Sequence, residues 1–133
     1  MKKIFPAILM CMAMTAFGQS VSKIEEVASN YLTSFFAMDY DAACALCSEE
    51  VAAAIRFATS AVEIPSEELR TKIEKASQST TFEIISSEIV SGKGETPRAK
   101  VCYNITTPTS EKAIPKEMTL EKRESGWIIT GLI

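Results

Sequence analysis

The apolar residues of this sequence change their spacing once, near residue 80, and that change constrains the fold more than any other feature. From residue 20 to about 78 they recur every three or four positions, as on one face of a helix. From about residue 80 to the end they alternate or form short runs, which is typical of strands. Helices followed by strands predict an α+β fold, with N-terminal helices packed on a curved antiparallel sheet. No internal repeat or low-complexity linker divides the chain.

Four helices are expected in the first part of the chain. The longest ends near residue 37, and the residues that share its apolar face are Ile24, Val27, Ala28, Tyr31, Leu32, Phe35 and Phe36. Either Asp39 or Asp41 can then cap a short helix over residues 42–47. A serine followed by two glutamates occurs twice, which predicts the starts of two further helices near residues 49 and 67.

The second part of the chain predicts four strands, over residues 81–90, 98–107, 116–123 and 127–132. In the first of them the apolar residues change parity, which a β-bulge near Ser86 and Ser87 would explain. The second alternates cleanly between apolar and polar residues. The last is apolar on both faces, so both should be covered. Helices are expected on one face, and a second copy of the chain is the candidate for the other, as a homodimer through the sheet.

The N-terminus has the pattern of a secretory signal peptide. Two lysines follow the first methionine, and an apolar run of about 14 residues leads to Ala16-Phe17-Gly18. Because a membrane-spanning helix needs roughly 20 apolar residues, we expect cleavage after Gly18 rather than an anchor. The expected domain is then residues 19–133, periplasmic or secreted, with no later transmembrane segment. Lipidation of Cys11 is disfavoured because Met10, rather than a small residue, precedes it.

Charge and composition exclude several classes of function. The chain has no histidine, which rules out a Ser-His-Asp triad, a Cys-His pair and a histidine-ligated zinc. Loss of two lysines with the signal segment changes the formal net charge from -3 to -5, and nucleic-acid binding would need a basic surface instead. The acidic residues lack the alternating pattern of a calcium loop. We therefore expect no metal, no cofactor and no nucleic acid.

Three cysteines would remain in the mature chain, Cys44, Cys47 and Cys102. An oxidising compartment permits one disulfide among them, and all three pairings are open. A bridge to Cys102 requires the short helix to cover the polar face of the second strand. A redox role for the Cys44-x-x-Cys47 pair is disfavoured because no strand precedes its helix.

Two segments resemble a known superfamily. Residues 31–43 read Tyr-Leu-Thr-Ser-Phe-Phe-Ala-Met-Asp-Tyr-Asp-Ala-Ala, and the last strand begins Gly-Trp-Ile-Ile. In this order the chain resembles the nuclear-transport-factor-two-like superfamily, also called SnoaL-like cones. It is most similar to the secreted bacterial branch of domain of unknown function 4878 and lumazine-binding-like proteins. The resemblance implies a cone-shaped, cystatin-like roll, in which the sheet wraps the first helix and leaves a pocket between them.

Aromatic residues are the candidates for lining that pocket: Tyr31, Phe35, Tyr103 and Trp127. The two tyrosines are favoured because a buried hydroxyl needs a hydrogen-bond partner. Enzymes of the superfamily place a carboxylate in the cone, whereas the inward positions of the last three strands here are apolar. The faces of Glu83 and Glu88 on the first strand are ambiguous because of the bulge.

The leading hypothesis is accordingly a non-catalytic domain that binds a small apolar ligand or a protein partner. One alternative is a small isomerase- or dehydratase-like enzyme that uses a pocket carboxylate. The other is a purely structural dimerisation module.

Overall fold

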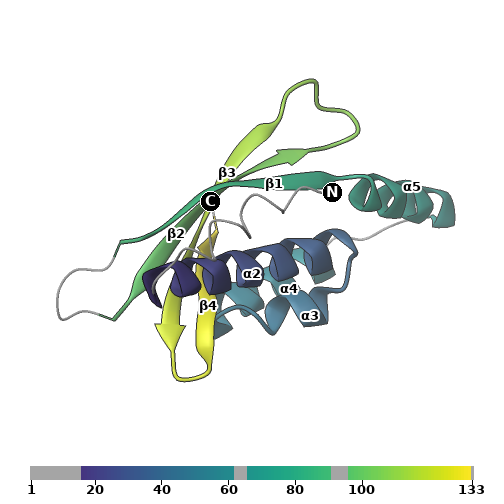
Figure 1. The fold of residues 1–133 in the computed structure, drawn as a ribbon. Coiled ribbons are helices and arrows are strands. Elements are labelled where there is room, and N and C mark those ends of the chain that lie inside the picture. Colours follow the sequence, from purple (N-terminus) through teal and green to yellow (C-terminus); the bar gives the residue numbers. More distant parts are fainter. Residues whose placement is uncertain (1–15, 62–65, 91–95, 133) are drawn as a thin grey trace.

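The computed structural model describes residues 16–61, 66–90 and 96–132. Helices precede strands in these residues, which confirms the predicted α+β class (Figure 1). Residues 1–15 of the predicted signal peptide lie outside the described residues, whereas residues 16–18 begin helix α2, which continues through the predicted cleavage site after Gly18. The elements are α2 (Ala16–Phe36), α3 (Tyr40–Cys44), α4 (Glu49–Ala61), α5 (Glu67–Gln78), β1 (Thr81–Ile89), β2 (Arg98–Thr106), β3 (Ile114–Arg123) and β4 (Gly126–Leu132).

The strands form one open antiparallel sheet in the order β1-β2-β3-β4, so each strand pairs with its neighbour in sequence. Helices α2, α3 and α4 lie on one side of this sheet, and α5 lies beyond the start of β1 (Figure 1). The core between sheet and helices includes the alternating residues of β2 that the sequence assigns to one face. Its largest fully buried side chains are Ile24, Leu32, Val101, Met118, Leu120 and Ile129.

The corner between α2 and α3 follows from two residues. Met38 has a left-handed backbone conformation with φ of 64°, which ends α2. The next residue, Asp39, caps α3, since its side chain accepts a hydrogen bond from the Ala42 amide at 3.2 Å. Of the two aspartates that the sequence offers, Asp39 is therefore the cap. The short helix begins at Tyr40, two residues earlier than predicted.

The predicted bulge in β1 is present. Ile84 and Ser86 pair with adjacent residues of β2, which leaves Ile85 without a partner. The extra residue switches the faces, so that Phe82 and Ile84 before the bulge and Ile89 after it all pack against the core. Ile85 itself is 53% exposed.

A second bulge, in β4, was not predicted. Ile129 and Gly131 pair with adjacent residues of β3, so Thr130 is the extra residue. Leu132 therefore faces the same side of the sheet as Ile129, towards the helices.

The segment after α3 connects the helical layer to the edge of the sheet. The Ile129 amide donates a hydrogen bond to the Leu46 carbonyl at 2.9 Å, and the Ser48 amide donates to the Ile129 carbonyl at 2.8 Å. The Ser48 hydroxyl also accepts from the Val51 amide in the first turn of α4, at 3.3 Å. This buried serine thus fixes the start of α4 relative to β4.

A candidate ligand-binding groove

Two aromatic residues of α2, one turn apart, form the centre of the candidate site. The rings of Tyr31 and Phe35 are stacked, with centroids 5.8 Å apart and an angle of 29° between their planes. Phe35 also makes edge-to-face contacts with Phe36 and Tyr40, at 5.5 and 5.4 Å. These contacts hold the two rings at positions that the helical periodicity places on one face.

A first hollow of about 390 Å³ lies between α2, α4 and the end of β4. A second hollow of about 170 Å³ lies between α2 and the sheet. Both are lined by Tyr31, Phe35 and Leu132, so they adjoin and form one site, which we call the groove. The other lining residues are Glu50, Val51, Ala54, Ile55, Ala58 and Thr59 in the first hollow, and Leu32, Phe36, Tyr103, Ile105 and Lys116 in the second.

The two tyrosine hydroxyls of the groove have no hydrogen-bond partner among the described residues. Tyr31 and Tyr103 are only 3% and 5% exposed, yet no buried side-chain oxygen in the described part of the chain lacks a partner. Their hydroxyl oxygens are therefore not fully enclosed by the protein. Burial raises the pKa of both phenols, and the nearby Cys47 and Tyr103 raise that of Tyr31 further. Both remain protonated, as hydrogen-bond donors, at physiological pH.

Opposite charges lie in the two hollows. Lys116 lines the second hollow and is the cross-strand partner of Tyr103, so the two side chains lie side by side on the inner face of the sheet. Glu50 lines the first hollow. In the ranges that the structure describes, Lys116 makes no ion pair. Lys116 is not among the residues predicted from the sequence to line the pocket, although it has the same strand parity as the inward-facing Met118 and Leu120.

Of the four predicted pocket residues, the groove brings together Tyr31, Phe35 and Tyr103. The fourth, Trp127, lines neither hollow and lies in the hydrophobic core, 8% exposed. It stands at the start of β4, next to the turn into that strand, whereas Leu132 at the other end of β4 lines the groove. Trp127 thus belongs to the core rather than to the predicted pocket wall.

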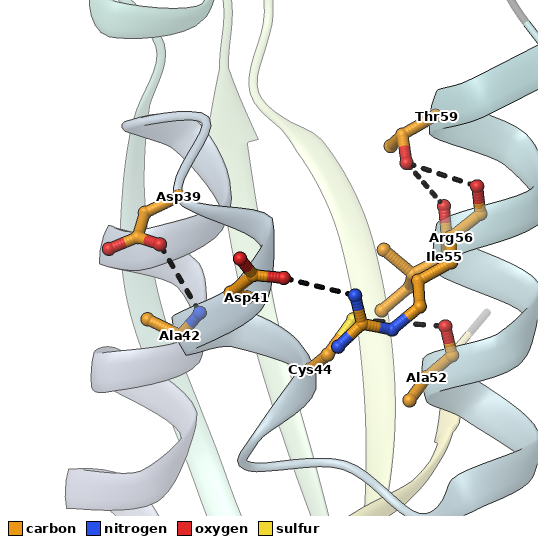
Figure 2. Close-up of polar contacts among 8 residues, drawn as sticks. All are labelled: Asp39, Asp41, Ala42, Cys44, Ala52, Ile55, Arg56 and Thr59. Carbon is orange, nitrogen blue, oxygen red and sulfur yellow. Dashed lines mark hydrogen bonds and ion pairs between the residues drawn. The ribbon is translucent and has the colours of Figure 1, made fainter.

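Polar contacts hold α4, one wall of the groove, against α3 (Figure 2). The Cys44 thiol donates to the Ala52 carbonyl of α4, with a sulfur–oxygen distance of 3.7 Å. Asp41 of α3 forms an ion pair with Arg56 of α4 at 3.0 Å, and this hydrogen bond raises the pKa of the guanidinium. Since both charged groups are exposed, the ion pair contributes little stability and acts mainly in orientation.

Among the described residues, Cys44, Cys47 and Cys102 are free thiols. Cys44 lies in the core and Cys47 at its edge, whereas Cys102 lies on the opposite face of the sheet from its buried neighbours in β2. Because α3 lies with α2 and α4 on the other side of the sheet from Cys102, the condition for a bridge to Cys102 is not met. The Cys44–Cys47 pairing stays a prediction. Burial and the neighbouring Cys44 raise the pKa of the Cys47 thiol to about 12, which disfavours the thiolate that redox catalysis requires.

The two carboxylates considered for an enzymatic pocket lie on the outer face of the sheet. Glu83 and Glu88 are both exposed, and Glu88 is 3.7 Å from Lys100, its cross-strand partner. Neither lines the groove, and the carboxylate among its lining residues is Glu50 instead.

Comparison with known proteins identifies no relative of this chain. The sequence matches no protein-family model, and no curated protein is significantly similar to it.

Within residues 16–61, 66–90 and 96–132, no group of three or more cysteine, aspartate or glutamate residues could hold a metal ion. None of the helices described here is long and apolar enough to cross a membrane. Function therefore has to be inferred from the groove.

Proposed function

We propose that the protein is a non-catalytic domain that binds a small apolar ligand in the groove. The observation that carries this proposal is the combination of two adjoining apolar hollows with tyrosine hydroxyls that have no partner in the described chain. Ligand sites are mostly apolar concavities of roughly 300–1,000 Å³ with a few polar groups that orient the ligand. The first hollow alone falls in this range. The outward direction of Glu83 and Glu88 favours binding over catalysis.

We further propose that the domain belongs to the nuclear-transport-factor-two-like cones and is secreted or periplasmic after cleavage at Gly18. The antiparallel meander with helices on one face is compatible with that cone, as is a groove between the first described helix and the sheet. The charged start and short apolar run of the sequence support secretion.

Binding of Nile red, an uncharged apolar dye, tests the proposed function. The wild-type protein should show saturable binding with a blue-shifted emission. Ala54→Trp should weaken it at least tenfold, because Ala54 is an exposed residue of α4 that lines the first hollow, where the indole would fill the space. Ala53→Trp is the matched control, since Ala53 is also exposed on α4 but does not line the groove. No saturable binding by the wild type, or equal effects of the two substitutions, would refute the proposal.

The homodimer expected through the outer face of the sheet is a separate proposal. That face carries half-buried Cys102 and Ile128, but also the charged pair of Lys100 and Glu88. Light scattering over a range of concentrations decides it, and a strict monomer at high concentration would exclude it.

A further inference from the structure

Three residues whose side chains carry hydrogen-bond donors line the second hollow of the groove. They are Tyr31, Tyr103 and Lys116, and we call their hydroxyl and ammonium groups the donor cluster. Tyr103 and Lys116 are cross-strand partners, and Tyr31 reaches the same hollow from α2. The influence of Tyr103 on the pKa of Tyr31 is consistent with two phenols that lie close together.

Nothing in the described chain accepts a hydrogen bond from any member of the donor cluster. Buried tyrosine hydroxyls are normally paired, and an ammonium group carries three N–H donors and no acceptor. The complement of such a cluster is a group that is rich in acceptors and negatively charged. A carboxylate offers two oxygens with about four lone-pair sites, and hydrogen bonds to ionised groups are the strong ones.

The rest of the groove restricts where such a charge can lie. The first hollow is apolar apart from Glu50 and Thr59, and Glu50 would repel an anion. An anionic head at the donor cluster would place the remainder of the ligand past Phe35 and Leu132, along Ala54, Ile55 and Ala58 of α4. The positive charge of Lys116 and the negative charge of Glu50 thus favour one orientation of an anionic amphipathic ligand, with its head in the second hollow and its tail in the first.

We propose that the ligand is an amphipathic monocarboxylic acid, with its carboxylate on Tyr31, Tyr103 and Lys116 and its hydrocarbon tail along α4. This inference rests on the proposed function and specifies the ligand class of the same groove. Uncharged apolar molecules would bind through the tail contacts alone, and cationic amphiphiles would meet Lys116 with the wrong sign.

Displacement of Nile red by three ten-carbon compounds tests the head-group preference: decanoate, decanol and decylammonium. Decanoate should bind at least about tenfold more tightly than decanol, since charged hydrogen bonds are involved, and more tightly than decylammonium, whose head can pair only with Glu50 among the lining residues. Added salt should weaken decanoate binding while leaving decanol unchanged.

Substitution of the lysine gives the matched test. Lys116→Met should reduce the affinity for decanoate about tenfold relative to decanol, with the affinity of the variant for Nile red titrated directly as the reference for both. Lys122→Met is the control, because Lys122 is exposed on the same face of β3 but does not line the groove. If decanol competes as well as decanoate, or if Lys116→Met affects both equally, the carboxylate proposal is wrong while binding of apolar molecules stands. If Nile red does not bind the wild type, the proposed function itself fails.

Discussion

Gly131 is the residue whose substitution best tests the geometry of β4. A Cβ atom at this position would lie 2.5 Å from the Thr119 Oγ1 and 3.9 Å from the Thr119 Cβ, with no other nearby atom. The two residues are cross-strand partners beside the bulge. Real Cβ contacts are longer than 3.0 Å, so either the threonine side chain or the backbone must shift. The expected cost of such overpacking is about 1–3 kcal/mol.

Removal of the threonine hydroxyl should reverse the sign of this effect. The backbone of Gly131 does not have positive φ, so alanine is compatible with it apart from the contact with Thr119. In a Thr119→Ala background, Gly131→Ala should therefore stabilise the protein by about 0.4–1 kcal/mol, because alanine restricts the unfolded chain. The coupling between the two substitutions should accordingly exceed about 1 kcal/mol.

Urea unfolding followed by tryptophan fluorescence measures all four proteins of this cycle. Trp127 is the single tryptophan, it is buried, and it stands on β4, so its emission reports the strand under test. A coupling energy near zero would show that Thr119 rotates away without cost. In that case the close packing at the bulge, and with it the position of Leu132 in the groove, would need revision.

Two further predictions concern stability. The Cys47 thiol has its pKa raised from 9.0 to about 12 in the folded state, so above pH 9 the unfolded chain loses its proton first. The contribution of this thiol to stability is therefore fully present below pH 9 and is lost as pH rises towards 12. In the Cys47→Ala variant, the free energy of unfolding should fall less steeply between pH 9 and 10 than in the wild type. Equal dependence of the unfolding free energy on pH in the two proteins would contradict this. Ser48→Ala should destabilise by about 1 kcal/mol, because it removes the acceptor for the Val51 amide at the start of α4. Thermal denaturation followed by circular dichroism measures the Tm of this variant and of a control, Ser60→Ala, which changes an exposed serine near the end of α4. Equal decreases in Tm for the two variants would disprove a capping role for Ser48.

The order of the helices and strands, and one of the two bulges, could be predicted from the sequence. In β1 the apolar residues change parity, and only an inserted residue explains that change when one face is buried. In β4 the residues are apolar on both faces, so an extra residue leaves no trace in the pattern. The position of Leu132 in the groove therefore could not be read from the sequence, and it depends on the pairing with β3.

The site was predicted in part for similar reasons. Helical spacing places Tyr31 and Phe35 together, and strand parity places Tyr103 on the inner face, so three groove residues could be anticipated. Parity also gives Lys116 and Trp127 inward positions, but it does not say which end of a strand the helices cover. The structure shows that they cover the Trp127 end, whereas Lys116 lines the groove at the other end of the sheet. A lysine in an inward position at a strand end is a signal that could have been used.

The hydrogen bonds from the segment after α3 to Ile129 also limit how copies of this protein could assemble. They occupy the outer edge of β4 at Ile129, in the middle of the strand, while within the described residues no segment occupies the outer edge of β1. Growth of a fibre by strand addition needs two open edges in each molecule, one for the preceding copy and one for the next. With one edge interrupted by its own chain, pairing through β1 would end at two molecules, so the fold tolerates a self-limited pair but resists unlimited polymerisation.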